Sequence, residues 1–144
     1  MPSAHDIIKS TIQAGSVYYY HDKVLKSPKQ HNFIVININP SKDTVIFLVC
    51  SSTGVDKTRK LRKYCPSETL VEITPTQYSG FSKKSIIDCN QVFERSIDEI
   101  VAMFSRRKLQ RKPVMDLRLI RKLRQGVILS SLIPSRIRAL LQTD

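Results

Sequence analysis

The stretch NFIVININPSKDTVIFLVCSS, residues 32–52, decides the fold of this chain. It holds two runs rich in Ile, Val, Phe and Leu, and PSKD at 40–43 separates them with residues typical of a hairpin turn. The pattern predicts two antiparallel strands, 32–39 and 44–52. Because their apolar content is almost continuous, we expect both strands to lie at the centre of a sheet, covered on both sides.

The sequence on either side extends this sheet. Three further runs predict short strands, at 16–20, 69–75 and 85–93. A short helix is expected before the first of them, with Ser3 as its N-cap and Gly15 as its stop signal. The first two-thirds of the chain therefore predicts about five strands, arranged as a small antiparallel barrel or sheet.

The last third of the chain predicts helices. Ser96 and Glu99 form a capping box, so a helix is expected from about Ile97. A second helix is expected at 114–125 with Gly126 as its end, and a third from about residue 131 to 141. Strands followed by helices indicate an α+β fold. We expect one domain over residues 1–144, with a barrel at about 15–95 and a helical extension at 96–144.

The charge of the chain is high and uneven. Lys and Arg number 24 against 12 Asp and Glu, which gives a net charge of +12. Residues 101–144 alone carry 11 basic and 2 acidic side chains. Such an excess favours binding to phosphate-bearing or acidic partners, and RNA is the first choice.

The sequence gives little support for a metal-binding, secreted or membrane protein. The three cysteines form no C-x-x-C pair, and the three histidines lack zinc-like spacing, so no metal or other cofactor is expected. No secretion signal and no apolar run of about 20 residues is present, which favours a cytoplasmic protein that does not enter a membrane.

Basic residues gather in three places within the predicted sheet. The densest group, at 57–63, lies in a stretch expected to be a loop. Tyr64 follows it directly and offers an aromatic ring on which a base can stack. The alternative is a solvated loop without a partner. The residues expected to bind nucleic acid are Lys26, Lys57, Arg59, Lys60, Arg62, Lys63, Tyr64, Lys83 and Lys84.

Four segments resemble the MazF/PemK/Kid toxin family. GSVYYY at 15–20 is similar to the family's first strand, and KQHNFIVIN at 29–37 and TVIFLVCSST at 44–53 are similar to its paired second and third strands. KKSIIDCNQVF at 83–93 resembles a later strand. The resemblance spans roughly residues 15–142.

The resemblance implies a fold, an activity and partners. It implies a small SH3-like barrel with a C-terminal helix, and a homodimer that cuts single-stranded RNA without a metal. It also implies an antitoxin protein whose acidic tail lies across the RNA groove. The chain is then expected to be an endoribonuclease toxin that uses the ribose 2′-hydroxyl as nucleophile.

The chain departs from the family where the catalytic arginine is expected. The family carries Arg-Pro at the start of the second strand, whereas this chain has His31 and Asn32 there, with Lys29 nearby. Histidine transfers protons near neutral pH. We expect His31 as acid or base and Lys29 as a positive charge beside the phosphate. A hydroxyl at the end of the third strand would orient a phosphate oxygen, with Ser52 and Thr53 as candidates and Ser51 beside them.

Two other functions fit the same residues. A nucleic-acid-binding module of the same fold, without catalysis, fits the missing Arg-Pro. A toxin directed at a protein such as DNA gyrase would need neither His31 nor the basic stretch. In either case His31 is a strand-end histidine bonded to a backbone carbonyl, and residues 51–53 form an ordinary turn.

Overall fold

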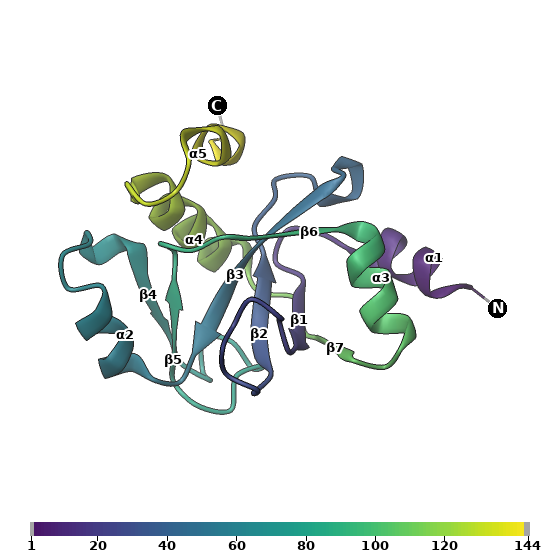
Figure 1. The fold of residues 1–144 in the computed structure, drawn as a ribbon, viewed down its shortest axis with the longest axis horizontal. Helices are drawn as coiled ribbons and strands as arrows, with labels where there is room; N and C mark the ends of the chain where they lie inside the picture. Colours follow the sequence, from purple (N-terminus) through teal and green to yellow (C-terminus); the bar gives the residue numbers. More distant parts are fainter. Residues whose placement is uncertain (1, 143–144) are drawn as a thin grey trace.

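The computed structural model describes residues 2–142 and shows an antiparallel sheet with helices packed on it (Figure 1). The expected mixed α+β class is therefore confirmed. The strands are β1 (Val17–Tyr20), β2 (His31–Val35), β3 (Val45–Ser52), β4 (Leu70–Ile73), β5 (Ser85–Asp88), β6 (Phe93–Ser96) and β7 (Leu109–Lys112). The helices are α1 (Ala4–Thr11), α2 (Val55–Leu61), α3 (Ile97–Ser105), α4 (Leu117–Leu129) and α5 (Ser135–Leu141), with short 3-10 turns at Pro40–Lys42 and Ser67–Thr69.

The strands follow the order β4-β5-β3-β2-β1-β7, and β6 pairs with β3 beside β5. Within residues 2–142 no pairing joins β4 to β7, so the path is open and does not close into a barrel. The long strand β3 is the hub of the sheet. One edge of it pairs with β2, and the other pairs with β6 and then with β5.

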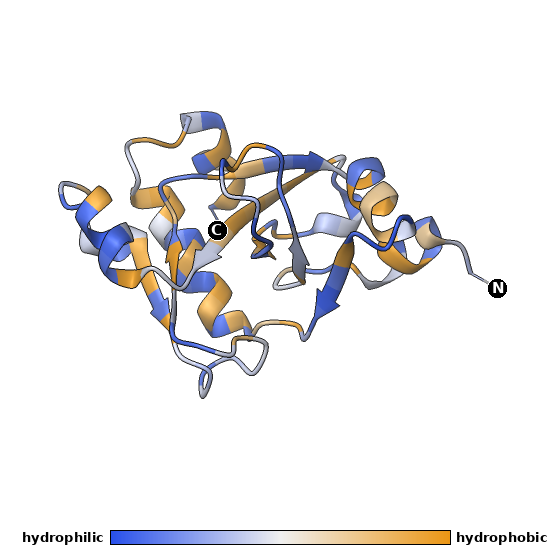
Figure 2. Cartoon of the chain, turned by 60° about the horizontal axis from the view of Figure 1, so that its bottom comes forward, coloured by the Kyte–Doolittle hydropathy of each residue, from blue (hydrophilic) through white to orange (hydrophobic). Residues whose placement is uncertain are grey.

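Both faces of the central strands are buried, as their apolar content predicted. Alternate residues point to opposite sides of a strand, and here each side meets helices. Ile34, Ile36 and Val49 pack under α4 and α5, whereas Phe33 and Leu48 pack under α1 and α3. Figure 1 shows these two pairs of helices on different sides of the sheet, and in Figure 2 the central strands are mostly orange while α2 is mainly blue.

The predicted hairpin forms, but β2 ends earlier than expected. Beyond Val35 one backbone bond remains, from the N–H of Ile36 to the carbonyl of Phe47 at 3.0 Å, and the side chain of Asn37 then takes the place of backbone pairing. Its Nδ2 donates to the carbonyl of Val45 at 2.9 Å, and its Oδ1 accepts from the backbone N–H of Phe47 at 2.7 Å. The carbonyls of Ile36 and Asn37 are thereby left for another donor.

The predicted strand at 85–93 is two strands, because a turn at Cys89 and Asn90 interrupts it. The carboxylate of Asp88 holds this turn by accepting from the backbone N–H of Asn90 at 3.0 Å. The two pieces pair with the same edge of β3. Strand structure was therefore predicted correctly for this segment, but its division into two strands was not.

The starts of α1 and α3 were predicted well, whereas two helix ends were not, since α1 already ends at Thr11, ahead of Gly15. Ser3 caps α1, and Ser96 with Glu99 forms the expected capping box of α3, which begins at Ile97. By contrast, α4 runs through Gly126 to Leu129. A Cβ at Gly126 would lie 2.8 Å from the carbonyl oxygen of Glu68, so this glycine permits close packing and does not end the helix.

The C-terminal third is not wholly helical. Residues 109–112 form β7, which pairs with β1 in the register Val17↔Lys112 and Tyr20↔Leu109. The expected last helix begins at Ser135 and not near 131, because Pro134 serves as its N-cap. None of the helices within residues 2–142 has the length and apolarity needed to cross a bilayer.

Candidate nucleic-acid interface

Four loops meet at one end of the sheet. The antiparallel registers bring together the finish of β1, β3 and β4 with the start of β2, β5 and β7. The loops at this end comprise residues 21–30, 53–54, 74–84 and 106–108, along the lower side of the sheet in Figure 1. We call this region the sheet end.

Positive charge is concentrated at the sheet end. Its loops carry eight basic residues against one acidic residue, Asp22. Lys84 pairs with Glu72 at 3.3 Å, and the other seven form no ion pair within residues 2–142. All eight side chains are exposed: Lys23, Lys26, Lys29, Lys83, Lys84, Arg106, Arg107 and Lys108. The surface therefore offers positive charge that the described part of the chain leaves largely unbalanced.

The β1–β2 loop is anchored by a buried ion pair. Asp22 is almost fully buried, and its carboxylate accepts from Nε of Arg95 at 3.0 Å. It also accepts from the hydroxyl of Tyr20 at 3.2 Å and from the backbone N–H of Val24 at 2.9 Å. This anchor fixes the base of the loop, so that Lys26 and Lys29 are presented to solvent from a held segment.

The candidate catalytic residues lie at the sheet end, on adjacent strands. His31 begins β2, and Ser52 ends its antiparallel neighbour β3, with Thr53 directly after it. Nδ1 of His31 lies 3.2 Å from the carbonyl oxygen of Lys29. This is the strand-end contact of the non-catalytic interpretation, but it also fixes the ring. A carbonyl can only accept, so Nδ1 holds the proton and Nε2 is left as a potential base.

The three neighbouring hydroxyls differ in access. Ser51 is buried within the sheet, and the Oγ of Ser52 accepts from the backbone N–H of Gly54 at 3.0 Å. Thr53 is exposed. Access therefore favours Thr53, and Ser52 keeps its hydroxyl proton for donation to a ligand.

The densest basic stretch is a helix and not the predicted loop. Residues 55–61 form α2, because Lys, Arg and Leu favour helices and Asp56 lies in the first turn. Arg59 pairs with Glu72 and Arg62 with Asp88, each at 2.9 Å. These two arginines therefore hold α2 against β4 and β5.

The remaining residues of that stretch face solvent. Lys57, Lys60 and Lys63 are exposed, and Tyr64 is 92% exposed. The ammonium of Lys63 lies 5.1 Å from the centroid of the Tyr64 ring. This part of the prediction, a basic surface with a neighbouring aromatic ring, matches the geometry, although it continues along α2 away from the sheet end.

The basic turn at 106–108 was not predicted as part of the site. The backbone N–H of Lys108 donates to the carbonyl of Met103 at 2.8 Å, and that of Arg107 donates to Phe104 at 3.1 Å. This is the Schellman end of α3, and it needs a left-handed residue, usually glycine. Arg107 occupies that position with φ of 59°, at a cost in backbone strain. A charged side chain thus occupies a position where glycine would make the fold more stable.

The cysteines form no disulfide and do not supply a nucleophile at the sheet end. Burial raises the pKa of the Cys50 thiol to about 12, and the charges of Asp22 and Asp88 add to this effect. Within residues 2–142 no three His, Cys, Asp or Glu side chains are grouped to hold a metal ion. Among the expected catalytic residues, His31 carries the side chain that ordinarily transfers protons near neutral pH.

Neither a scan against protein-family models nor a search of the curated proteins found a match to this chain.

Proposed function

We propose that this protein binds single-stranded RNA at the sheet end. One observation carries the proposal: three loops, distant in sequence, place eight exposed basic side chains at one end of the sheet, and seven of them form no ion pair within residues 2–142. Exposed cations of this kind suit a chain of phosphates, because each contact releases counterions and none requires a buried charge.

The surface suits a flexible strand better than a duplex. Its charges stand on loops of different length and continue along α2, where Tyr64 offers an uncovered ring for stacking. Base stacking on an aromatic ring requires an unpaired base, and a basic track beside it can follow the backbone.

Cleavage of the bound RNA is the second candidate function, favoured by the position of His31. Its Nε2 is free to take the proton of a ribose 2′-hydroxyl, which then attacks the adjacent phosphorus and expels the 5′-oxygen. The leaving 5′-oxygen takes a proton from solvent water. Lys29 would stabilise the charge on the phosphate, and the hydroxyl of Ser52 or Thr53 would orient one of its oxygens. The products would be a 2′,3′-cyclic phosphate and a free 5′-hydroxyl.

The same proposal makes the protein a toxin of the MazF/PemK/Kid kind. Its sheet would be a variant of the SH3-like barrel in which the strand path stays open between β4 and β7. It would act as a homodimer, and an acidic antitoxin would cover the sheet end. If the protein binds no RNA, a toxin directed at another protein becomes the better interpretation.

Binding is tested by the salt dependence of affinity. A labelled single-stranded RNA is titrated with wild type, with a Lys26→Gln, Lys29→Gln, Lys83→Gln triple variant, and with a matched triple variant at Lys9, Lys42 and Lys122. Each phosphate contact contributes roughly 0.7 to the slope of log K against log salt for single strands, so the first variant should lose up to about 2 from that slope. Equal losses in the two variants would contradict a site at the sheet end.

Cleavage is tested separately, on a long single-stranded RNA with EDTA present. Discrete cuts that end in 2′,3′-cyclic phosphates, absent in His31→Ala and weakened in Thr53→Ala, would support the enzyme. RNA that is bound but stays intact would reject catalysis and leave an RNA-binding module.

A further inference from the structure

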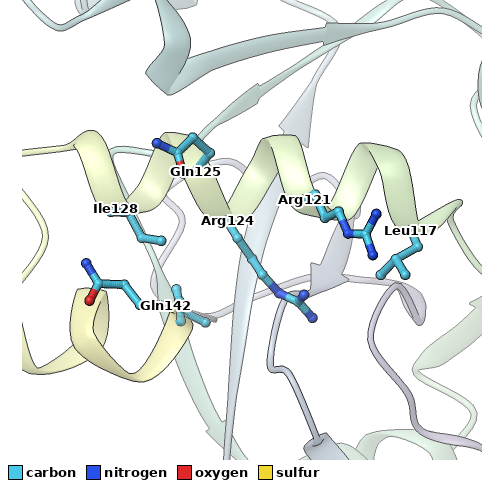
Figure 3. Close-up of a pocket in the computed structure, with 7 residues that line it drawn as sticks. Leu117, Arg121, Arg124, Gln125, Ile128 and Gln142 are labelled. Carbon is cyan, nitrogen blue, oxygen red and sulfur yellow. The ribbon is translucent and has the colours of Figure 1, made fainter. Parts of the chain in front are cut away.

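A groove lies between α4 and α5, away from the candidate catalytic residues. It has a volume of about 770 Å³. Arg121 and Arg124 line it from α4, together with the apolar side chains of Leu117 and Ile128, and Gln142 lies at the end of α5 (Figure 3).

Arg124 is buried without a counter-charge among residues 2–142. Its residue is 7% exposed, although it lies in a helix at the protein surface. Nε donates to the carbonyl of Ile36 at 2.7 Å and Nη2 donates to the carbonyl of Asn37 at 2.9 Å. These are the carbonyls that the early end of β2 leaves without partners. No carboxylate within residues 2–142 pairs with Arg124, so the described part of the chain leaves its positive charge uncompensated.

Arg121 brings a second positive charge to the same groove. Figure 3 shows both arginine side chains leaving the same side of α4, one turn apart. Burial lowers the pKa of Arg124, and the charge of Arg121 lowers it further. Arg121 itself is exposed and forms no ion pair within the described residues. Two positively charged guanidinium groups thus line one open groove, where a bound anion would offset both charges.

The other lining residues indicate the chemistry of that anion. Leu117 and Ile128 give the groove an apolar part, and Gln125 and Gln142 add amide groups. An aliphatic side chain next to a carboxylate matches this mixture, whereas the sugar-phosphate backbone of RNA offers no aliphatic group to it. Planar guanidinium groups also bind carboxylates in bidentate geometry.

We infer that the α4–α5 groove binds an acidic segment of a partner protein, in which Asp or Glu alternates with aliphatic residues. The carboxylates meet Arg121 and the remaining N–H groups of Arg124, and the aliphatic side chains contact Leu117 and Ile128. The groove lies beside Ile36 and Asn37, at the opposite end of β2 from His31. A peptide in the groove therefore leaves the sheet end open, and both surfaces can be occupied at once.

The test uses a fluorescent pool of short peptides in which Asp or Glu alternates with Leu or Ile, and a control pool with Asn and Gln in place of the acids. Fluorescence anisotropy at low salt compares wild type with Arg121→Gln and with Lys122→Gln. Lys122 neighbours Arg121 and is exposed, but it does not line the groove, so it matches the charge change. We expect binding of the acidic pool only, weakened about tenfold by Arg121→Gln and less than about twofold by Lys122→Gln.

A second measurement locates the peptide on the protein. The Nε–H resonance of Arg124 should shift when the acidic pool is added and stay unchanged with the neutral pool. An unlabelled single-stranded RNA should not displace the peptides. The inference is overturned if the acidic pool does not bind, if the two variants weaken binding equally, or if RNA competes with the pool and shifts the same resonance.

Discussion

The sheet end and the α4–α5 groove both carry positive charge, but they hold it in different ways. At the sheet end the cations stand on loops and face water, with Lys26 and Lys29 as examples. In the groove Arg124 lies within a packed helix, and its guanidinium donates hydrogen bonds to two backbone carbonyls. Exposed charge is free to meet many phosphates, whereas a buried charge is committed to one geometry.

This difference predicts how substitutions in each region should affect binding and stability. Removing loop cations should alter binding and leave stability nearly unchanged, since exposed charges contribute little to folding. Removing the buried groups that fix either region should alter stability first. Four substitutions test this contrast, from the largest expected effect to the smallest.

The largest effect is expected at the anchor of the β1–β2 loop. Asp22→Asn keeps the shape of the side chain and leaves the guanidinium of Arg95 buried without its counter-charge. We expect a loss of about 3 kcal/mol in the free energy of unfolding, measured with urea. Asp56→Asn, an exposed change in the first turn of α2, should cost at most about 0.5 kcal/mol. Equal costs would show that the loop is not held by this pair.

The next effect is expected in the groove. Arg124→Met keeps much of the side-chain volume but leaves the carbonyls of Ile36 and Asn37 without donors. Relief of the uncompensated charge offsets part of this cost, so we expect a net loss of about 2 kcal/mol in the free energy of unfolding. Arg121→Met should change it by less than about 0.5 kcal/mol. A stable Arg124→Met protein would contradict the structural role of this guanidinium.

A smaller loss is expected where α4 is seated against the sheet. In Gly126→Ala the new methyl group meets the carbonyl of Glu68 and the Sγ of Cys89. Overpacking of this kind costs about 2 kcal/mol, and the better helix propensity of alanine returns about 1 kcal/mol. Thermal unfolding should therefore show a modest decrease in Tm. Gln125→Ala, on the exposed side, should not lower it.

The smallest change in stability is a gain, at Arg107. Arg107→Gly places glycine at the left-handed end of α3 and should stabilise the fold by about 1 kcal/mol. The same change removes a cation of the sheet end, so RNA affinity should fall. Arg106→Gly removes an equal charge at a residue with negative φ, and it should weaken RNA binding without the gain in stability. If Arg107→Gly binds RNA as well as wild type, the strained arginine has no part in the interface.

The central strands and the starts of α1 and α3 could be predicted because their signals are local. The apolar runs on either side of 40–43 predict β2 and β3, and Ser96 with Glu99 predicts the start of α3 from four neighbouring residues. Gly126 shows the limit of such signals. A glycine in a helix pattern is typical of a helix end. Here a glycine is needed because the carbonyl of Glu68, which is remote in sequence, leaves no room for a Cβ.

The candidate site was predicted only in part, for the same reason. Lys26, Lys83 and Lys84 were expected to bind nucleic acid and Lys29 to place a positive charge beside the phosphate, and the strand registers place all four at the sheet end. The turn at 106–108 joins them only because 109–112 pairs with β1, and the sequence LQRK carries no strand pattern of its own. Arg59 and Arg62 were expected to bind RNA, but in the structure they pair with carboxylates on β4 and β5. These partners come later in the chain, so the local sequence contained no sign of the pairing.

The pairing of β1 with β7 also bears on how the chain assembles. Among the seven described strands β1 is synthesised first and β7 last, so one edge of β1 stays without a neighbour until residues 109–112 have been made. Closing contacts between such distant segments is slow, since the chain loses loop entropy before the contacts form. Folding should therefore finish at this edge, and a nascent chain that stalls before residue 109 would present β1 as an open edge for aggregation.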